Sequence, residues 1–298
     1  MIETETATSR TQAVHHRYAT VDGRRLFYRE AGRASAPVVV LLHGFPASSF
    51  MFRGLIPELA DKYRVIAPDH LGFGFSDAPT VEDFTYTFDA LADLTWRLLV
   101  KLELEHCAIY VQDYGAPIGW RLALAHPEAI TAIVTQNGNG YEVGFVESFW
   151  APVKDYWREK TPETEAALRG ALTLDAIRWQ YLHGVADASL VCPDAWFHDY
   201  TQVSRPGNDL VQLQLFADYE TNLGLYPSLH TYLRDSEVPL LAVWGANDEI
   251  FGPAGAEAFK ADAPDAEIHL LDGGHFLLES HLIQATGYIR AFLERGLD

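Results

Sequence analysis

The sequence predicts an α/β protein in which a mostly parallel sheet is flanked by helices and interrupted by an inserted helical segment. Short β-rich runs alternate with helix-like segments along most of the chain. Several of these runs are apolar throughout, as is typical of parallel strands that are covered on both faces. The alternation stops between residues 139 and 235, and a chain of 298 residues is long enough for a main domain that carries such an insertion.

The expected strands and helices follow one another in a regular order. Residues 88–102 predict an amphipathic helix because Phe88, Leu91 and Leu98 recur near one face. A second helix-like run covers residues 117–126 and follows directly on a strand-like run. Seven strands are expected, at residues 26–29, 38–42, 64–68, 107–111, 130–135, 240–244 and 268–271.

These patterns divide the chain into three parts. Residues 1–16 are polar and are expected to form a flexible leader. Residues 17–138 and 236–298 are expected to form the core domain. Residues 139–235 show helical spacing without a clear strand, and we interpret them as a helical cap inserted after the sixth strand. Four of the seven tryptophans lie in this segment, and most are expected to pack its core: Trp150, Trp157, Trp179 and Trp196.

The charge and the apolar runs limit the partners that the protein can have. A formal net charge of -19 repels nucleic acid and anionic membranes, so we expect a small uncharged, apolar substrate. Near the front of the chain, the longest apolar run is far shorter than the roughly 20 residues that span a bilayer. The first ten residues show no secretory signal, which favours the cytoplasm. Monomer and homodimer both remain open.

The cysteines and histidines show no metal or disulfide pattern. Cys107 and Cys192 are the only two cysteines, too few for a disulfide framework, and we interpret both as structural thiols. The twelve histidines form no recognisable metal motif, and His15 and His16 fall in the expected leader. The sequence therefore predicts an enzyme without metal or cofactor, if it is an enzyme.

Asp113 is the most informative residue of the chain. It lies between an apolar strand-like run and a helix-like run, in the strand, sharp turn and helix of a nucleophile elbow. A carboxylate at that position displaces a leaving group from a saturated carbon and leaves an alkyl ester on the enzyme. This chemistry indicates epoxides or alkyl halides as substrates.

Three further loops complete the pattern that a nucleophile elbow requires. The loop after the strand at 38–42 places the N–H of Phe45 beside that of Tyr114, so that the two form an oxyanion hole. Asp248 follows the strand at 240–244, and His275 follows the strand at 268–271. The chain order of nucleophile, acid and histidine is the one that the hydrolase fold imposes. We therefore expect Asp113, Asp248 and His275 to form a catalytic triad.

From about residue 18 to its end, the chain resembles the α/β-hydrolase fold enzymes of the epoxide hydrolase and haloalkane dehalogenase branch. The resemblance implies a mostly parallel eight-stranded sheet flanked by helices, with an inserted helical cap, and an aspartate nucleophile. It rests on the motifs H-G-F-P at residues 43–46, G-F-G-F-S-D at 72–77, Q-D-Y-G at 112–115, N-D at 247–248 and G-G-H at 273–275.

Within this branch the sequence favours an epoxide hydrolase. Haloalkane dehalogenases resemble the chain but often carry tryptophan after the nucleophile, where this chain has Tyr114, and H-G-F-P is typical of epoxide hydrolases. The family uses two cap tyrosines to donate protons to the epoxide oxygen, and the resemblance implies Tyr156 and Tyr219. Tyr141, Tyr181 and Tyr226 are substitutes for them. Residues expected around the substrate are His43, Trp150, Trp157 and Phe276.

Two other functions remain open. A haloalkane dehalogenase would use the same triad of Asp113, His275 and Asp248 and would hold the halide with indole N–H groups such as those of Trp150 or Trp157. A binding protein without catalysis is also compatible with a hydrolase fold. The presence of a nucleophile, its base and an oxyanion loop favours an enzyme that uses water as its second substrate.

Overall fold

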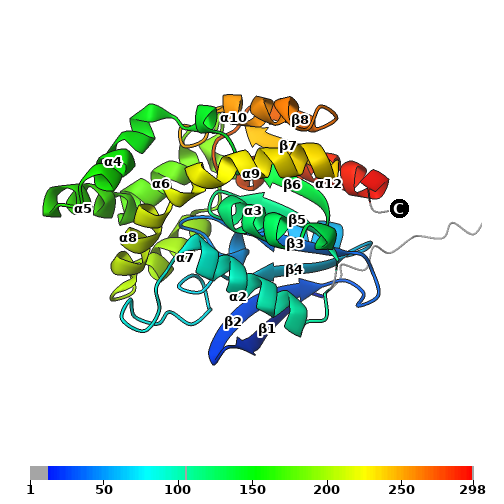
Figure 1. Cartoon of the computed structure of the whole chain (residues 1–298), viewed down its shortest axis with the longest axis horizontal. Helices are drawn as coiled ribbons and strands as arrows, with labels where there is room; N and C mark the ends of the chain where they lie inside the picture. The colour runs from blue at the N-terminus through cyan, green and yellow to red at the C-terminus, as the bar shows by residue number, and fades with distance from the viewer. Residues whose placement is uncertain (1–12, 105, 297–298) are drawn as a thin grey trace, which may run out of the picture.

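A single eight-stranded sheet forms the centre of the molecule in this computed structural model, which describes residues 13–104 and 106–296. The strand order is β1-β2-β4-β3-β5-β6-β7-β8. Strand β2 pairs antiparallel with β1 and β4, and the remaining pairs are parallel (Figure 1). The strands are β1 (His15–Val21), β2 (Arg24–Ala31), β3 (Val38–Leu42), β4 (Arg64–Pro68), β5 (Cys107–Gln112), β6 (Ile130–Gln136), β7 (Leu240–Gly245) and β8 (Glu267–Leu271).

Helices cover both faces of this sheet. Helix α3 packs on β5 and β3 and is flanked by α2 and α9, while α12 packs on β6 and β7 beside α1 and α11. The core helices are α1 (Leu55–Leu59), α2 (Phe88–Lys101), α3 (Gly115–Ala125), α10 (Pro253–Ala258), α11 (Leu277–Ser280) and α12 (Leu282–Gly296). Between β6 and β7 lie α4 (Glu147–Arg158), α5 (Pro162–Arg169), α6 (Leu174–Leu182), α7 (Pro193–Val203), α8 (Asn208–Asp218) and α9 (Thr221–Ser236).

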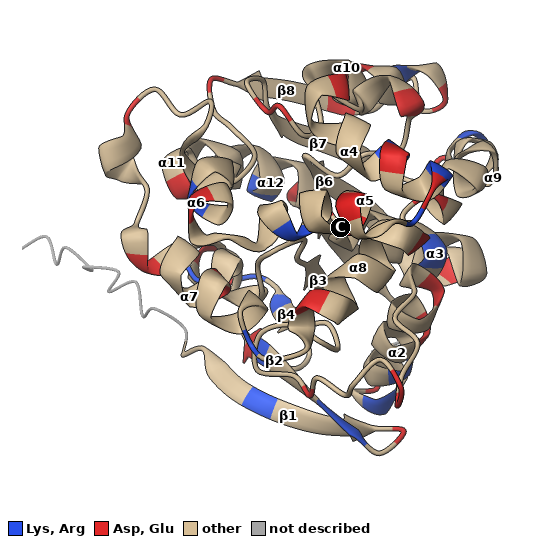
Figure 2. Cartoon of the chain, turned by 90° about the vertical axis from the view of Figure 1, so that its left-hand side faces the viewer, with Lys and Arg blue, Asp and Glu red and all other residues tan. Residues whose placement is uncertain are grey.

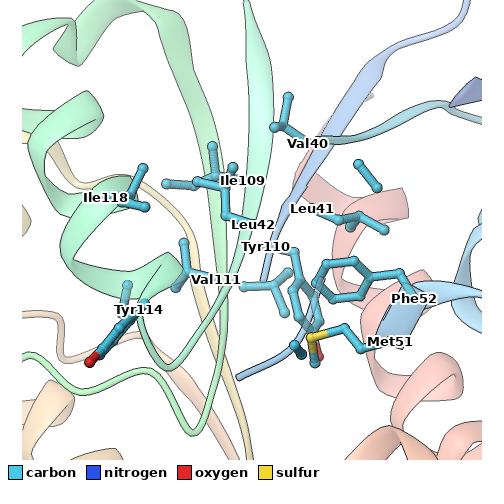
Figure 3. Packing of buried hydrophobic residues seen from close by; sticks show 14 of the residues in the cluster. Val40, Leu41, Leu42, Met51, Phe52, Ile109, Tyr110, Val111, Tyr114 and Ile118 are labelled. Carbon is cyan, nitrogen blue, oxygen red and sulfur yellow. The ribbon is translucent and has the colours of Figure 1, made fainter. Parts of the chain in front are cut away.

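The alternation of side chains along β3 and β5 builds the two layers of the core. Leu42, Ile109 and Val111 face α3, because all three lie within 4 Å of where a Cβ on Gly119 of α3 would be. Tyr110 points to the other side, where its ring packs edge-on against Phe52 at 5.4 Å (Figure 3). All of these side chains are nearly or completely buried. Because both faces are covered, the strands need continuous apolar runs, which the sequence provides.

The inserted helices gather at one end of the molecule. Figure 1 shows α4, α5, α6 and α8 beyond the ends of the strands, and Figure 2, seen from that side, shows α5 and α8 in front of the sheet. Helix α9 returns along the core beside α3. The insertion therefore lies over the edge of the sheet where the parallel strands end, which is where open α/β sheets form their sites.

The predicted α/β architecture with an eight-stranded, mostly parallel sheet is confirmed, and all seven expected strands are present. The predicted leader ends too late in the chain, because His15 and His16 pair with Glu30 and Arg29 of β2 and already belong to β1. This strand lies at the edge of the sheet and exposes most of its side chains, so it lacks an apolar run. Residues 1–12 of the expected leader lie outside the described residues. Within the described ranges, no helix is long and apolar enough to cross a membrane.

Candidate active site

Asp113 occupies a tight turn between β5 and α3. Its φ of 48° is uncommon for a residue with a side chain. The chain is crowded here: a Cβ on Gly115 would lie 2.1 Å from the carbonyl oxygen of Leu42, and one on Gly44 would lie 2.2 Å from Cβ of Asp113. The two glycines thus allow the loop after β3 and the start of α3 to approach the carboxylate closely.

The two oxygens of the Asp113 carboxylate lie in different environments. The backbone N–H groups of Phe45 and Tyr114 both donate to Oδ1, each at 2.6 Å. Oδ2 makes no hydrogen bond within the described part of the chain and lies 3.8 Å from Nε2 of His275. One oxygen is therefore held by two fixed donors, and the other is free to attack an electrophile.

His275 and Asp248 approach Asp113 from the ends of β8 and β7. Nδ1 of His275 lies 2.8 Å from Oδ2 of Asp248. The other oxygen of Asp248 accepts the N–H of Ile250 at 2.7 Å. The arrangement holds the imidazole with its Nε2 toward the nucleophile, as a nucleophile, base and orienting acid require. The structure thus brings together the three residues that the sequence predicted as a triad.

Burial changes the acidity of both reacting groups. It raises the pKa of Asp113 from 3.8 to about 6, although the charge of His275 and the two N–H donors act in the opposite direction. Burial alone would lower the pKa of His275, but the charge and hydrogen bond of Asp248 and the charge of Asp113 raise it. The site therefore contains a carboxylate that is costly to ionise and an imidazole that accepts a proton readily.

Three amide side chains also hold these residues, and none of the three roles was predicted, although Gln112 belongs to the Q-D-Y-G motif. Nε2 of Gln112 lies 2.8 Å from Nε2 of His275. Gln136 donates to the carbonyl oxygen of His275 at 2.9 Å, and Asn137 donates to Oδ2 of Asp248 at 2.8 Å. The signal that Gln136 and Asn137 give in the sequence is their position, since both are polar residues at the end of a buried apolar run.

Aromatic rings from the core and the insertion surround the nucleophile. The Tyr114 ring lies 5.7 Å from that of Phe45 and 6.4 Å from that of Phe216 in α8. Tyr219, between α8 and α9, lies 5.9 Å from Tyr114 and 4.7 Å from Trp150. Asp113 is only 5% exposed beneath these rings. Asp113 thus lies in a buried, largely apolar environment.

Among the described residues, two buried phenol groups in this cluster have no carboxylate, amide or backbone acceptor. The hydroxyl of Tyr114 is unpaired within the described residues. The hydroxyl of Tyr219 has only the phenol of Tyr226 beside it, and this neighbour adds to the effect of burial in raising the pKa of Tyr219. Burial raises the pKa of Tyr114 and Tyr219 well above the usual value, so both are protonated donors at neutral pH.

Among the described residues, neither Tyr156 nor His43 makes a hydrogen bond, an ion pair or a ring contact with Asp113. The Tyr156 ring lies 5.7 Å from the ammonium group of Lys160, and burial and Glu165, not Asp113, raise its pKa. The His43 ring is buried, and both of its nitrogens bond to backbone, one to the carbonyl oxygen of Gly44 and one to the N–H of His70. His43 therefore joins two loops and offers no free nitrogen to a substrate.

The remaining expected residues lie near the site, but some have their polar groups occupied. Trp150 donates its indole N–H to the carbonyl oxygen of Ile250 at 2.9 Å, and Trp157 donates to that of Phe216 at 2.7 Å. Phe276 packs edge-on against His275 at 5.2 Å. Among the substitute tyrosines, Tyr141 and Tyr181 donate to Asp262 and Asp199. Within the described ranges, no cluster of three or more His, Cys, Asp or Glu side chains is arranged to hold a metal ion.

Residues 37–282 match the family model of the alpha/beta hydrolase fold, so the chain belongs to this family. An uncharacterized hydrolase of Saccharomyces cerevisiae is 45% identical over 271 residues, which cover 90% of this chain and 93% of the relative. These similarities support a hydrolase.

Relatives with more specific names are less similar or match a shorter segment. The epoxide hydrolase 3 of Mus musculus is 26% identical over 91% of this chain and 74% of its own length. A haloalkane dehalogenase of Mycobacterium marinum is 43% identical over 38% of each chain. The crystal structure of Cfl2 from Burkholderia cenocepacia superposes with a TM-score of 0.79 at 25% identity, covering 95% of this chain and 97% of that one.

The burial of Asp113 predicts that Asp113→Asn stabilises the fold. A raised pKa means that the ionised carboxylate destabilises the folded state above the pH at which the unfolded chain ionises. The gain in free energy of unfolding should be absent below about pH 4 and should grow to at most about 3 kcal/mol above about pH 6. Urea denaturation between pH 4 and pH 8 measures it. Asp265→Asn, at an exposed position, is the control, and an Asp113→Asn protein no more stable than the parent at pH 7 would contradict the prediction.

Proposed function

We propose that the protein is an epoxide hydrolase, which opens an epoxide to a vicinal diol through an ester on Asp113. The observation that carries the proposal is the pair of buried, protonated phenols of Tyr114 and Tyr219 beside Asp113, neither of which donates to a carboxylate, an amide or a backbone carbonyl among the described residues. An epoxide needs such donors, because its oxygen becomes an alkoxide as the ring opens. Tyr219 retains the role expected from the sequence, and Tyr114 takes the place expected for Tyr156.

In the first step, Oδ2 of Asp113 attacks one epoxide carbon, and the carbon–oxygen bond of the ring breaks. The phenol of Tyr219 or Tyr114 gives its proton to the departing oxygen, so a hydroxyalkyl ester and a phenolate form. Oδ1 stays with the N–H groups of Phe45 and Tyr114, which keep the carboxylate oriented for attack by the free oxygen.

In the second step, water hydrolyses this ester. His275 takes a proton from water through Nε2, and the hydroxide adds to the carboxyl carbon of Asp113. Negative charge develops on Oδ1, where the two N–H groups already point. Collapse breaks the bond to the alkyl oxygen, which takes the proton of His275 and leaves as the diol. The remaining acid proton of Asp113 restores the phenol.

The inserted segment, residues 139–235, serves as a cap in this proposal. It contributes Trp150, Phe216 and Tyr219 to the ring cluster around the nucleophile. This cluster excludes bulk water and favours a small apolar, uncharged substrate. Because Asp113 and His275 are both nearly fully buried, the cap helices must move relative to the core when substrate binds.

A haloalkane dehalogenase is the alternative with the same triad. The partial similarity to a haloalkane dehalogenase supports it. However, the indole N–H groups of Trp150 and Trp157 are both bonded to backbone carbonyls, so neither is free to hold a halide. The buried hydroxyl donors beside Asp113 are phenols, which fit an oxygen leaving group that needs a proton.

Product analysis tests the proposed function. The protein should convert simple terminal epoxides to diols faster than it releases bromide from 1-bromoalkanes of the same length, because only epoxides need the phenol protons. Asp113→Asn should lose diol formation and is the matched control. Faster release of bromide would establish the dehalogenase instead, and the absence of either product would favour a non-catalytic role.

A single turnover in oxygen-18 water then tests the ester. The label should enter the carboxylate of Asp113, because water attacks that carbon and the diol takes an oxygen from the side chain. Mass analysis of the peptide containing Asp113 measures this. Label found only in the diol would mean that water attacks the epoxide directly.

His275→Gln should accumulate the ester. Asp113 needs no base to attack, whereas water does, so ester formation should continue while its hydrolysis slows. Mass spectrometry of the intact protein should show an adduct with the mass of the epoxide. The double variant Asp113→Asn/His275→Gln is the control and should show none. An inactive His275→Gln protein without adduct would contradict this division of roles.

Tyr219→Phe should slow epoxide opening, and Tyr156→Phe should not. Removing one donor to a developing oxyanion typically costs about 10²- to 10³-fold in rate, and Tyr114→Phe should have a similar effect. Tyr156→Phe is the matched control, because that phenol lies in the same insertion but makes no contact with Asp113 among the described residues, and its charged neighbours are Lys160 and Glu165. Stopped-flow measurement of ester formation gives the rates. A greater loss of rate in Tyr156→Phe than in Tyr219→Phe would mean that Tyr156 is the proton donor and that Tyr219 is not.

A further inference from the structure

Gln112 makes the closest contact with the nitrogen that the proposed hydrolysis uses as a base. Its Nε2 lies 2.8 Å from Nε2 of His275, closer than Oδ2 of Asp113 at 3.8 Å. An amide nitrogen only donates, so the imidazole nitrogen accepts. This requires a neutral His275 whose proton is on Nδ1, where it is donated to Asp248 at 2.8 Å. In this state Gln112 occupies the lone pair that must receive the proton of water.

The same contact leaves the other end of the amide unsatisfied. Oε1 of Gln112 is buried and has no hydrogen-bond partner among the described residues, and the whole residue is fully buried. A Cβ on Gly44 would lie 2.6 Å from this oxygen and 2.5 Å from Oδ1 of Asp113, so both oxygens face the same glycine. Oε1 of Gln112 and Oδ1 of Asp113 are both acceptors. Their proximity is unfavourable when Asp113 is charged, because the two oxygens then repel each other.

Once His275 is protonated, half a turn of the carboxamide moves the N–H donor away from Nε2 of His275 and gives Oε1 of Gln112 a hydrogen-bond partner. Rotation about the last side-chain bond exchanges an oxygen for a nitrogen of nearly the same size, so no neighbour has to move. Oε1 would then accept the Nε2 proton of the imidazolium, and the NH2 group would face the side of Gly44 where Asp113 lies. If the amide did not turn, the NH2 group of Gln112 would face the Nε2–H of the protonated His275, and two donors would meet.

We propose that Gln112 is a positioning residue whose carboxamide turns with the protonation state of His275, donating to the neutral imidazole and accepting from the imidazolium. Its kinetic consequence rests on the proposed function. Water displaces the amide N–H at Nε2 and passes its proton to that nitrogen, and Oε1 then accepts the new N–H. The amide thereby stabilises the imidazolium until the alkyl oxygen takes the proton.

The charged groups around His275 are few, which allows the effect of Gln112 to be isolated. Asp248 and Asp113 are the two carboxylates that face the ring. Glu249, on the same loop as Asp248, pairs instead with His183 at 3.2 Å. The rings of Phe251 and Phe276 pack against the imidazole, and His183 and Glu249 line the same small pocket as His275. Replacing Gln112 with an apolar residue changes none of these charges.

Gln112→Leu separates the proposal from its alternatives through the pKa of His275. A turning amide stabilises the imidazolium more than the neutral ring, because a hydrogen bond to a charged group is the stronger one. Its loss should lower the pKa of His275 by about one unit. A fixed donor stabilises only the neutral ring, so its loss would raise the pKa. A rise, or no change, would overturn the proposal.

Nuclear magnetic resonance of nitrogen-15 labelled histidine measures this pKa, and His275→Gln assigns the signal. Gln112→Met provides a second apolar variant of similar length should Gln112→Leu not fold. Gln212→Leu is the matched control, because Gln212 is also fully buried with an unpaired Oε1 but bonds to Asn208. It should leave the pKa of His275 unchanged.

The kinetic consequence is measured separately. In Gln112→Leu the ester of the first step should form at the parental rate but decay up to about tenfold more slowly at alkaline pH, where His275 is neutral in both proteins and only its basicity differs by about one pKa unit. Slower ester formation with normal decay would overturn the positioning role. The magnetic resonance result does not depend on the substrate, so failure of the epoxide assay leaves the test of Gln112 intact.

Discussion

The two N–H donors that meet at Oδ1 of Asp113 are the contact on which the rest of the site depends. One comes from the loop after β3 and one from the start of α3, and both are 2.6 Å from the oxygen. They converge because β3 and β5 are neighbours in parallel register, with Leu42 opposite Val111. Gly44 and Gly115 permit the close approach. With Oδ1 fixed in this way, Oδ2 is the free oxygen, and the roles of the surrounding residues follow from that asymmetry.

The burial of Asp113 lowers the stability of the fold but favours the reactivity of the carboxylate. The rings that exclude water also make the Asp113 carboxylate costly to ionise, which raises its pKa to about 6. A less buried carboxylate would stabilise the fold but would be solvated and slower to attack. His275 balances part of this cost, since its charge lowers the pKa of Asp113, while Asp113 and Asp248 raise that of His275. The two groups therefore titrate as a coupled pair.

The positions of the site residues in the fold could be predicted from the sequence better than their side-chain contacts. Asp113, Asp248 and His275 follow buried apolar strands, and strand ends in a parallel sheet lie at one edge, so their meeting is a property of topology. The edge strand β1 was missed because its exposed side chains give no apolar signal. Tyr156 was expected at the site from the resemblance, but its ring lies beside Lys160, the charge of Glu165 in α5 acts on it, and among the described residues it makes no contact with Asp113. Cap packing is thus the part of the fold that a single sequence predicts least.

The amides around the triad were beyond sequence reasoning for a different reason. Gln112, Gln136 and Asn137 each gain their role from a partner more than one hundred residues away in the chain, so no local spacing marks them. Their chemistry explains why amides occupy these positions. An amide orients a neighbour without adding charge, whereas a carboxylate or an ammonium group there would shift the coupled titration of Asp113 and His275. An amide also both donates and accepts, so it can bond to the imidazole of His275 in either protonation state.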